Sequence, residues 1–301
     1  MYEKKTTLSR EIFWIKSKRV AKRQIFAYIM RQHETRFADK QFHDHFVFSV
    51  MELSTSSLLA ICGLFFAVAM LYSSVGHGGA SGYLAVLSFF AVSPKSMSTT
   101  GLILNLFVAS IAFITFYRAG HFSLPLTWPF LVASIPAAFL GGMITVPKSA
   151  YALLLALALA FAALRLMIQF RSEVSAKPIG RPSLPIMLVA GAGIGLISGI
   201  VGVGGGIFLS PLILLLNWAH PQKTSATSAI FILVNSLAGL VGRFFSGSFE
   251  IGMLAPFVLA AFLGGLAGAN LGANKFSSLT LRRALGVVLI IAAYKLIVVM
   301  L

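Results

Sequence analysis

The sequence predicts an all-α polytopic membrane protein made of two homologous halves, with helices that are broken or re-entrant at glycine-rich motifs. Three observations support this class. Of the 301 residues, 58% are hydrophobic and only 11% are charged, and the mean hydropathy of +0.90 is far too high for a water-soluble domain. Long apolar runs recur along residues 58–301. A glycine cluster occurs twice, as Gly76–Gly79 and as Gly202–Gly206, and a proline follows each time, at Pro94 and Pro221.

Residues 1–52 differ in character from the rest of the chain. They carry eleven Lys and Arg residues and six of the eight acidic residues, and no apolar run among them is long enough to cross a bilayer. Residues 11–30 alternate isoleucine and phenylalanine with Lys and Arg, a pattern typical of a basic amphipathic helix on an anionic membrane surface. We therefore predict a cytoplasmic or membrane-surface segment that contacts anionic lipid headgroups.

Ten apolar segments follow, five in each of two predicted transmembrane repeats, 53–170 and 186–301. The second segment of each repeat is too short to cross about 30 Å of hydrocarbon, so we expect the first two segments to form one broken or hairpin-like unit around the glycines. Residues 171–185 are rich in proline and basic side chains and predict an exposed linker. The segments are 58–75, 83–92, 97–117, 126–146 and 150–170, then 186–201, 207–218, 224–245, 251–273 and 282–301.

The two repeats can be aligned residue by residue, which makes a chance origin of the glycine clusters improbable. Duplicated halves with paired interrupted helices are a frequent plan of transporters and predict a binding site where the repeats meet. An offset of 126 pairs Gly76, Gly78 and Gly79 with Gly202, Gly204 and Gly205, and an offset of 127 pairs Pro94 with Pro221, Ser98 with Ser225, Thr100 with Thr227, Gly120 with Gly247, Phe122 with Phe249, Pro129 with Pro256, Gly141 with Gly268 and Lys148 with Lys275.

Basic residues predict the orientation. The segment 1–52 and the linker are both expected on the cytoplasmic side of the inner membrane. Both expectations hold only if the first half crosses an even number of times, which gives about four crossings per half and eight in all when each broken pair counts as one. An inverted repeat with an odd number of crossings per half is the alternative, because the first topology puts Lys275, Arg282 and Arg283 outside.

The glycine breaks predict an anion-binding site. A helix that begins just after a glycine turn has amide N–H groups without partners and a partial positive charge, which suits an oxyanion. His77 within the first break could add positive charge or a proton, or could close the loop as a neutral hydrogen-bonding group. Arg118 and Arg243 are expected to be interfacial anchors. The candidate substrate-binding residues are Gly76, His77, Gly78, Gly79, Ser81, Thr99, Thr100, Asn105, Gly202, Gly204, Gly205, Gly206, Ser225, Thr227, Ser228 and Asn235, with Ser98, Ser210 and Thr224 as further donors.

The chain lacks the sequence motifs that several other functions require. The chain has no GxxxxGK[ST] nucleotide loop, no nucleophile–base pair in its apolar segments and no cluster with metal-ligand spacing, so we expect neither an enzyme nor a bound cofactor or metal. The net charge of +16 is assigned to topology and not to nucleic-acid binding, and Cys62 is expected to be a small buried apolar residue. Energy must come from gradients, and the scarcity of acidic residues favours uncoupled movement of an anion.

The motifs resemble those of the sulfite exporter TauE/SafE family, also called the toluene sulfonate uptake permease group. The second-half signature runs from Gly202 through Pro211 to Leu212 and continues with Pro221 and Thr224–Ser228, and the resemblance covers residues 58–301. The first half departs from that pattern at His77, Ala80 and Ser81. What the resemblance implies is transport of sulfite, organosulfonates or some carboxylates across the inner membrane. The alternatives are a transporter of another small anion and a membrane receptor or scaffold that does not transport.

Overall fold

The computed structural model describes residues 55–89, 93–167, 180, 183–249, 255–274, 289–291, 293–294 and 296–298. The chain divides into two compact units, Met1–Glu52 and Leu53–Leu301, and the described residues all belong to the second. The predicted surface helix at 11–30 therefore lies outside the described residues.

All regular elements in the described part of the chain are helices, so the predicted all-α class is confirmed. Four of them, α4, α5, α7 and α9, are long and apolar enough to cross a membrane. The helices are α2 (Thr55–Ser73), α3 (Ala80–Ser88), α4 (Pro94–Arg118), α5 (Leu124–Met143), α6 (Lys148–Met167), α7 (Leu184–Val201), α8 (Gly206–Leu215), α9 (Pro221–Phe245) and α10 (Ala255–Asn274).

Helix lengths recur in the same order in the two halves of the chain. Helices α2 and α7 have 19 and 18 residues, α3 and α8 have 9 and 10, α4 and α9 have 25 each, and α5 and α10 have 20 each. Pro94 and Pro221 stand at the first position of α4 and α9, where the missing amide hydrogen has no cost because that group has no partner in the helix. The prolines after the glycine clusters therefore mark helix starts.

Glycines end α2 and α7 by turning the backbone into the left-handed region, with φ of 75° at Gly76 and 84° at Gly202. After each turn the next helix runs back along its own half. The Ala80 amide meets Asn105 and Leu84 packs on Gly101, so α3 runs antiparallel to α4. In the second half Gly206 faces Ile232 and Ser210 bonds Ser228 on α9, so α8 runs antiparallel to α9.

In the first pair Ser81 of α3 bonds Tyr72 of α2 and Gly82 faces Val68, so α2 and α3 run antiparallel as a hairpin. In the second pair α7 runs in the direction of α5 and α9, because Gly199 lies against Ala138 of α5 and Thr127 of α5 bonds Thr227 of α9, whereas α8 runs opposite to α9. The sequence left open a broken helix that crosses once and a hairpin, and the helix directions favour the hairpin. Glycine cannot be replaced easily at these turns, because a side chain at positive φ is strained.

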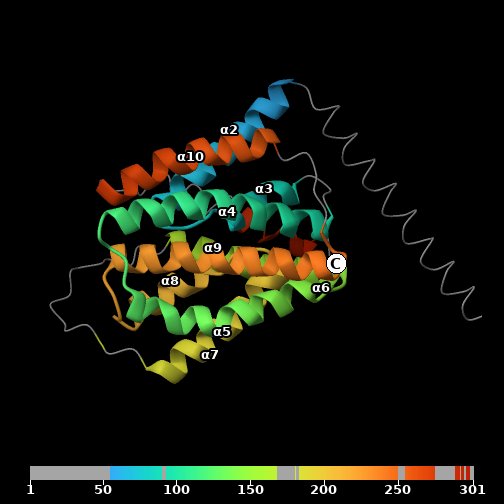
Figure 1. Cartoon of the computed structure of the whole chain (residues 1–301). Coiled ribbons are helices and arrows are strands. Elements are labelled where there is room, and N and C mark those ends of the chain that lie inside the picture. The colour runs from blue at the N-terminus through green and yellow to red at the C-terminus, as the bar shows by residue number, and fades with distance from the viewer. Residues whose placement is uncertain are drawn as a thin grey trace, which may run out of the picture. The chain divides into compact units, whose positions relative to one another are not determined.

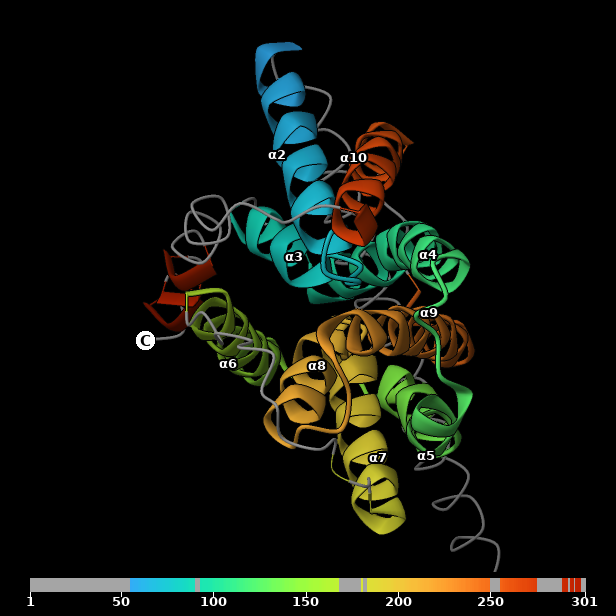
Figure 2. The same ribbon diagram turned by 90° about the vertical axis from the view of Figure 1, so that its left-hand side faces the viewer.

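The two halves exchange their outer helices. On α7, added Cβ atoms at Gly191, Gly195 and Gly199 would meet the α5 carbonyls of Phe130, Ser134 and Ala138 in turn, so α5 and α7 run parallel in close contact. Helices α2 and α10 form the matching parallel pair. Figures 1 and 2 show these two pairs on opposite sides of the bundle, with α4 and α9 between them. Small residues permit such close approach of helices in a membrane.

The same glycine contact recurs in both outer pairs. A Cβ at Gly141 would meet the carbonyl oxygen of Leu196, and a Cβ at Gly268 would meet that of Met70. Gly141 and Gly268 are related by the offset of 127, and Met70 and Leu196 by the offset of 126. The two outer pairs are therefore packed in the same register.

Helices α4 and α9 form the centre of the bundle and run antiparallel. Asn105 bonds Ser236, and one turn earlier on α4 Leu102 packs on Gly239, one turn later on α9. These are the most buried of the four long apolar helices. The outer helices instead expose apolar side chains such as Val132, Val189 and Leu259, which is the pattern of a surface that faces lipid.

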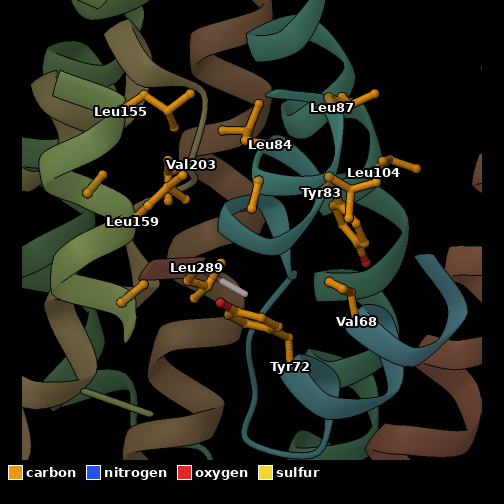
Figure 3. Close-up of a cluster of buried hydrophobic side chains, with 14 of the residues drawn as sticks. Val68, Tyr72, Tyr83, Leu84, Leu87, Leu104, Leu155, Leu159, Val203 and Leu289 are labelled. Atoms are coloured by element: carbon orange, nitrogen blue, oxygen red, sulfur yellow. The ribbon is translucent and has the colours of Figure 1, made fainter. Parts of the chain in front are cut away.

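A large apolar cluster surrounds the two turns. Figure 3 shows Leu84 and Leu87 of α3, Leu155 and Leu159 of α6 and Val203 of the second turn within it. Because both hairpins pack against the same cluster, burial of its side chains holds the turns at fixed positions relative to α4 and α6.

Candidate functional site

The tips of the two hairpins meet at Asn105 in the middle of α4. Its side-chain oxygen accepts a hydrogen bond from the Ala80 amide at 3.2 Å, and its nitrogen donates to the Val203 carbonyl at 3.2 Å and to Ser236 Oγ at 3.3 Å. Asn105 is fully buried, and its bonds join hairpin one (α2–α3), hairpin two (α7–α8) and α9. One amide side chain thus fixes the distance between the two turns.

His77 makes the second bridge between the hairpins. Its Nδ1 lies 2.8 Å from the carbonyl oxygen of Val75, and its Nε2 lies 3.1 Å from the carbonyl oxygen of Gly206 and 3.0 Å from Ser210 Oγ. Ser210 Oγ is in turn 2.7 Å from Ser228 Oγ on α9. The ring is 1% exposed. A line of polar atoms therefore runs from the first turn through the first helical turn of α8 to α9.

The starts of α3 and α8 differ although both follow a glycine with positive φ. Asn105 Oδ1 accepts a hydrogen bond from the first amide of α3, at Ala80. Among the described residues, the amides of Gly206 and Ile207 at the start of α8 have no hydrogen-bond acceptor. The expected symmetric pair of anion-binding helix ends is therefore unequal: two such amides mark the open end at α8, whereas in the described part of the chain α3 has only one, at Ser81.

A buried hydroxyl without a partner lies close to this open end. Ser198 on α7 is 0% exposed, and its Oγ has no hydrogen-bond partner among the described residues. A Cβ built on Gly205 would lie 3.5 Å from the Ser198 Cβ. A buried polar group left unbonded costs free energy, so this hydroxyl and the two amides together suit a ligand that accepts hydrogen bonds.

The structure gathers some of the predicted residues at the tips and separates others. Ser225 donates to the Val75 carbonyl at 3.0 Å, and Gly76 is packed against the Ser225 backbone. Ser81 instead donates to the Tyr72 hydroxyl, and Thr227 bonds Thr127 on α5, so these two hold helices together. The predicted residues that contact the opposite hairpin, or the central helix of the opposite half, are Gly76, His77, Gly202, Gly204, Gly206, Asn105 and Ser225.

The remaining predicted residues are buried or lie close to the tips without such a contact. Gly78 packs on the Asn105 side chain, and Gly79 lies against the Tyr83 hydroxyl. Thr99 has a buried hydroxyl without a partner among the described residues, as has the Asn235 side-chain oxygen, whose amide nitrogen donates to Phe231. The others are Thr100, which is 5% exposed, Gly205, which adjoins Ile194 and Phe231, and Ser228, which is bonded to Ser210.

Arg243 corrects the sequence-based prediction of an interfacial anchor. It is 4% exposed, and its Nη2 donates to the carbonyls of Gly199 and Ile200 at 2.8 and 2.7 Å. Tyr151 OH donates to the next carbonyl, of Val201, at 3.1 Å. These oxygens form the negative end of α7, so the guanidinium offsets their partial charge beside the second turn. The aligned residue in the first half, 127 positions earlier, is Phe116, so the repeat gave no signal for this role.

Comparison with known proteins identifies relatives for most of the described chain. The family described as "Sulfite exporter TauE/SafE" matches residues 60–296. The chain is 37% identical over 236 residues to the "Probable membrane transporter protein y4hK" of Sinorhizobium fredii, across 77% of this chain and 95% of that protein. It is 31% identical over 104 residues to the "Probable membrane transporter protein YunE" of Bacillus subtilis, across 35% of this chain and 38% of that protein. No solved structure matches the chain.

Proposed function

The chain belongs to the sulfite exporter TauE/SafE family of membrane transporters, and on that premise we propose that it is a secondary permease for a small oxyanion, sulfite or an organosulfonate. The anion would bind at the start of α8, between the two repeats. Family membership indicates a transporter. An oxyanion substrate is our inference from the chemistry of the hairpin tips, and sulfite or a sulfonate is what the family resemblance implies.

The observation that carries the proposal is the open helix end. Gly206 and Ile207 present amides without acceptors among the described residues, and the Ser198 hydroxyl beside them has no partner there. A helix start supplies partial positive charge and directional donors, which match the oxygens of a sulfite or sulfonate group. Arg243 offsets the partial negative charge of the carbonyls at the end of α7, beside the same turn. The described residues contain no carboxylate side chain that would repel an anion.

The helix directions support an inverted repeat with three crossings in each half. Helices α4 and α9 occupy the same place in their halves and run antiparallel, and each hairpin returns to the face from which it enters. This arrangement favours the odd count that the sequence left as the alternative. It also means that the start of α2 and the linker lie on opposite faces, so both cannot be cytoplasmic.

The positive-inside rule favours the linker face as the cytoplasmic one. This replaces the expectation of a cytoplasmic amino terminus. On this assignment Lys275, Arg282 and Arg283 fall on the inside, which removes the conflict noted for the eight-crossing topology. The rule counts charges within about 20 residues of a membrane-spanning helix, so of the eleven Lys and Arg residues in 1–52 only Arg36 and Lys40 count for the face at which α2 starts. The helix ends and connections of that face add Lys95 and Lys148, whereas those of the linker face carry Arg118, Arg165, Arg171, Lys177, Arg181, Lys223, Lys275, Arg282 and Arg283.

A cysteine at Lys177 tests this orientation. In a Cys62→Ala background, Lys177→Cys should react with a membrane-impermeant maleimide in inside-out vesicles and stay unlabelled in intact cells. Labelling of intact cells alone would reverse the orientation.

The transport proposal is tested in proteoliposomes. Purified protein should exchange internal for external sulfite or isethionate in a counterflow assay, and Ser198→Ala should weaken binding by about ten- to a hundredfold, the equivalent of one hydrogen bond to a charged group at about 1.5–3 kcal/mol. Ser110→Ala is the matched control, since that hydroxyl bonds the Leu106 carbonyl of its own helix. Binding without any exchange would favour the receptor, and exchange of carboxylates alone would identify a different anion.

A further inference from the structure

His77 has an oxygen acceptor at each ring nitrogen. Nδ1 faces the Val75 carbonyl at 2.8 Å and Nε2 faces the Gly206 carbonyl at 3.1 Å. A carbonyl oxygen can only accept a hydrogen bond, and a neutral imidazole has only one N–H. Both contacts are hydrogen bonds only when the ring carries a proton on each nitrogen. The geometry of the hairpin tips therefore accommodates an imidazolium, with the Ser210 hydroxyl as a second acceptor at Nε2.

The hydroxyls next to the ring allow the proton to leave. When Nε2 is unprotonated, the Ser210 hydroxyl can donate to it at 3.0 Å and accept from Ser228 at 2.7 Å. When Nε2 is protonated, it can donate to Ser210, and Ser210 can donate to Ser228. Hydroxyl hydrogens rotate to suit their partners. The neutral ring would, however, leave its Nε2 lone pair facing the lone pairs of Gly206. Loss of the proton thus weakens a direct contact between the two hairpins.

Among the described helices, no other side chain at the hairpin tips can bind and release a proton near neutral pH. The described residues include no Asp or Glu, and His121 and His220 flank the ends of α4 and α9. The titratable group packed against His77 is Tyr72 of α2, with ring centroids 6.4 Å apart, whereas α8 and α9 present the hydroxyls of Ser210 and Ser228. A histidine titrates near neutral pH and a tyrosine far above it.

We propose that His77 binds a proton that is co-transported with the anion. The inference rests on the proposed function, because it takes the start of α8 as the anion site. His77 contacts Gly206, the residue whose amide begins that site, so a positive ring and a bound anion stabilise each other. By linkage each ligand raises the affinity for the other, so the proton and the anion bind and cross together. This replaces the uncoupled movement expected from the scarcity of acidic residues.

The first experiment uses proteoliposomes with isethionate, whose charge is fixed. With the membrane potential held at zero by valinomycin and potassium, a pH one unit lower outside should drive accumulation of isethionate, up to about tenfold for one proton per anion. Trapped pyranine should report acidification of the lumen. In His77→Gln the steady-state accumulation ratio should fall to one, whereas His220→Gln, an exposed histidine at the start of α9, should keep the wild-type ratio.

The outcomes separate the two proposals. Absence of isethionate and sulfite counterflow in the wild type refutes the proposed function. Counterflow without accumulation under the pH gradient, or accumulation that persists in His77→Gln, overturns the proton site and leaves the permease intact.

A second measurement covers the case in which His77→Gln abolishes flux altogether. In lipid-reconstituted protein labelled with ¹⁵N-histidine and saturated with isethionate, solid-state NMR should show an imidazolium with both ring nitrogens protonated. That signal should be absent from His77→Gln. An unprotonated Nε2 on His77 in the isethionate complex would refute the proposal.

Discussion

Gly204→Ala tests whether the second turn needs its glycines for close contact and not only for backbone conformation. Gly204 has φ of 81°, and a Cβ there would overlap the Asn105 amide nitrogen and lie 2.8 Å from Ile232 Cγ2. The left-handed conformation costs a non-glycine residue about 1–2 kcal/mol. Displacing Asn105 adds an overpacking cost of about 1–3 kcal/mol and loss of the bond to Val203, worth about 0.5–1.5 kcal/mol.

Gly120→Ala and Gly247→Ala are the matched controls. Both glycines have positive φ, 77° and 66°, and no atom within 4 Å of an added Cβ, so they incur the backbone cost alone. The difference of about 3 kcal/mol corresponds to a melting temperature about 6–12 °C lower for Gly204→Ala than for either control. Thermal unfolding in detergent measures this, and counterflow should be lost in Gly204→Ala only. Equal melting temperatures and equal flux in the three variants would refute the close-contact argument.

Three further substitutions test other contacts by thermal unfolding and counterflow. Arg243→Met should destabilise the protein by about 1–3 kcal/mol by freeing two buried carbonyls, and an unchanged melting temperature would return Arg243 to the role of a surface anchor. Asn105→Leu should abolish counterflow because the Ala80 amide and the Val203 carbonyl lose their shared partner; wild-type exchange would show that the bridge is dispensable. Gly199→Ala should separate α7 from α5 and lower the melting temperature, whereas Gly193→Ala, with open space at its Cβ, should leave it unchanged or raise it by helix propensity of up to about 1 kcal/mol. Similar effects of the two glycine substitutions would contradict the packing.

Local features of the fold could be predicted from the sequence because they depend on local chemistry. Gly76 and Gly202 mark the turns because only glycine enters the left-handed region without strain, and Pro94 and Pro221 mark the starts of the helices that follow. Which helices pack together was not predictable. A glycine such as Gly141 indicates a close approach but not the partner that approaches, and the exchange of α5 and α10 between the halves is a tertiary property.

In the candidate site, too, some residue roles could be predicted from the sequence and others could not. His77 was predicted because a histidine within the first glycine break could add positive charge or a proton to the site, and the structure adds that it joins the two hairpins. Asn105 was expected to donate to a ligand, but its oxygen accepts from Ala80, and only the fold could reveal that acceptor role. Arg243 was predicted wrongly, because a basic residue in the last turn of an apolar helix usually reaches the lipid headgroups, whereas here the end of α7 supplies two carbonyl acceptors.

The exchange of outer helices has a consequence for biogenesis. Helix α2 leaves the ribosome first among the described helices, yet its parallel partner α10 is synthesised roughly 200 residues later, at a synthesis rate of about 5–20 residues per second. For on the order of ten seconds or more, the small-residue face of α2 has no partner from its own chain. An insertase or membrane chaperone that shields this face would therefore raise the yield of folded protein. Neither half expressed alone contains a complete outer pair, so each half should need the other to bury its small-residue faces.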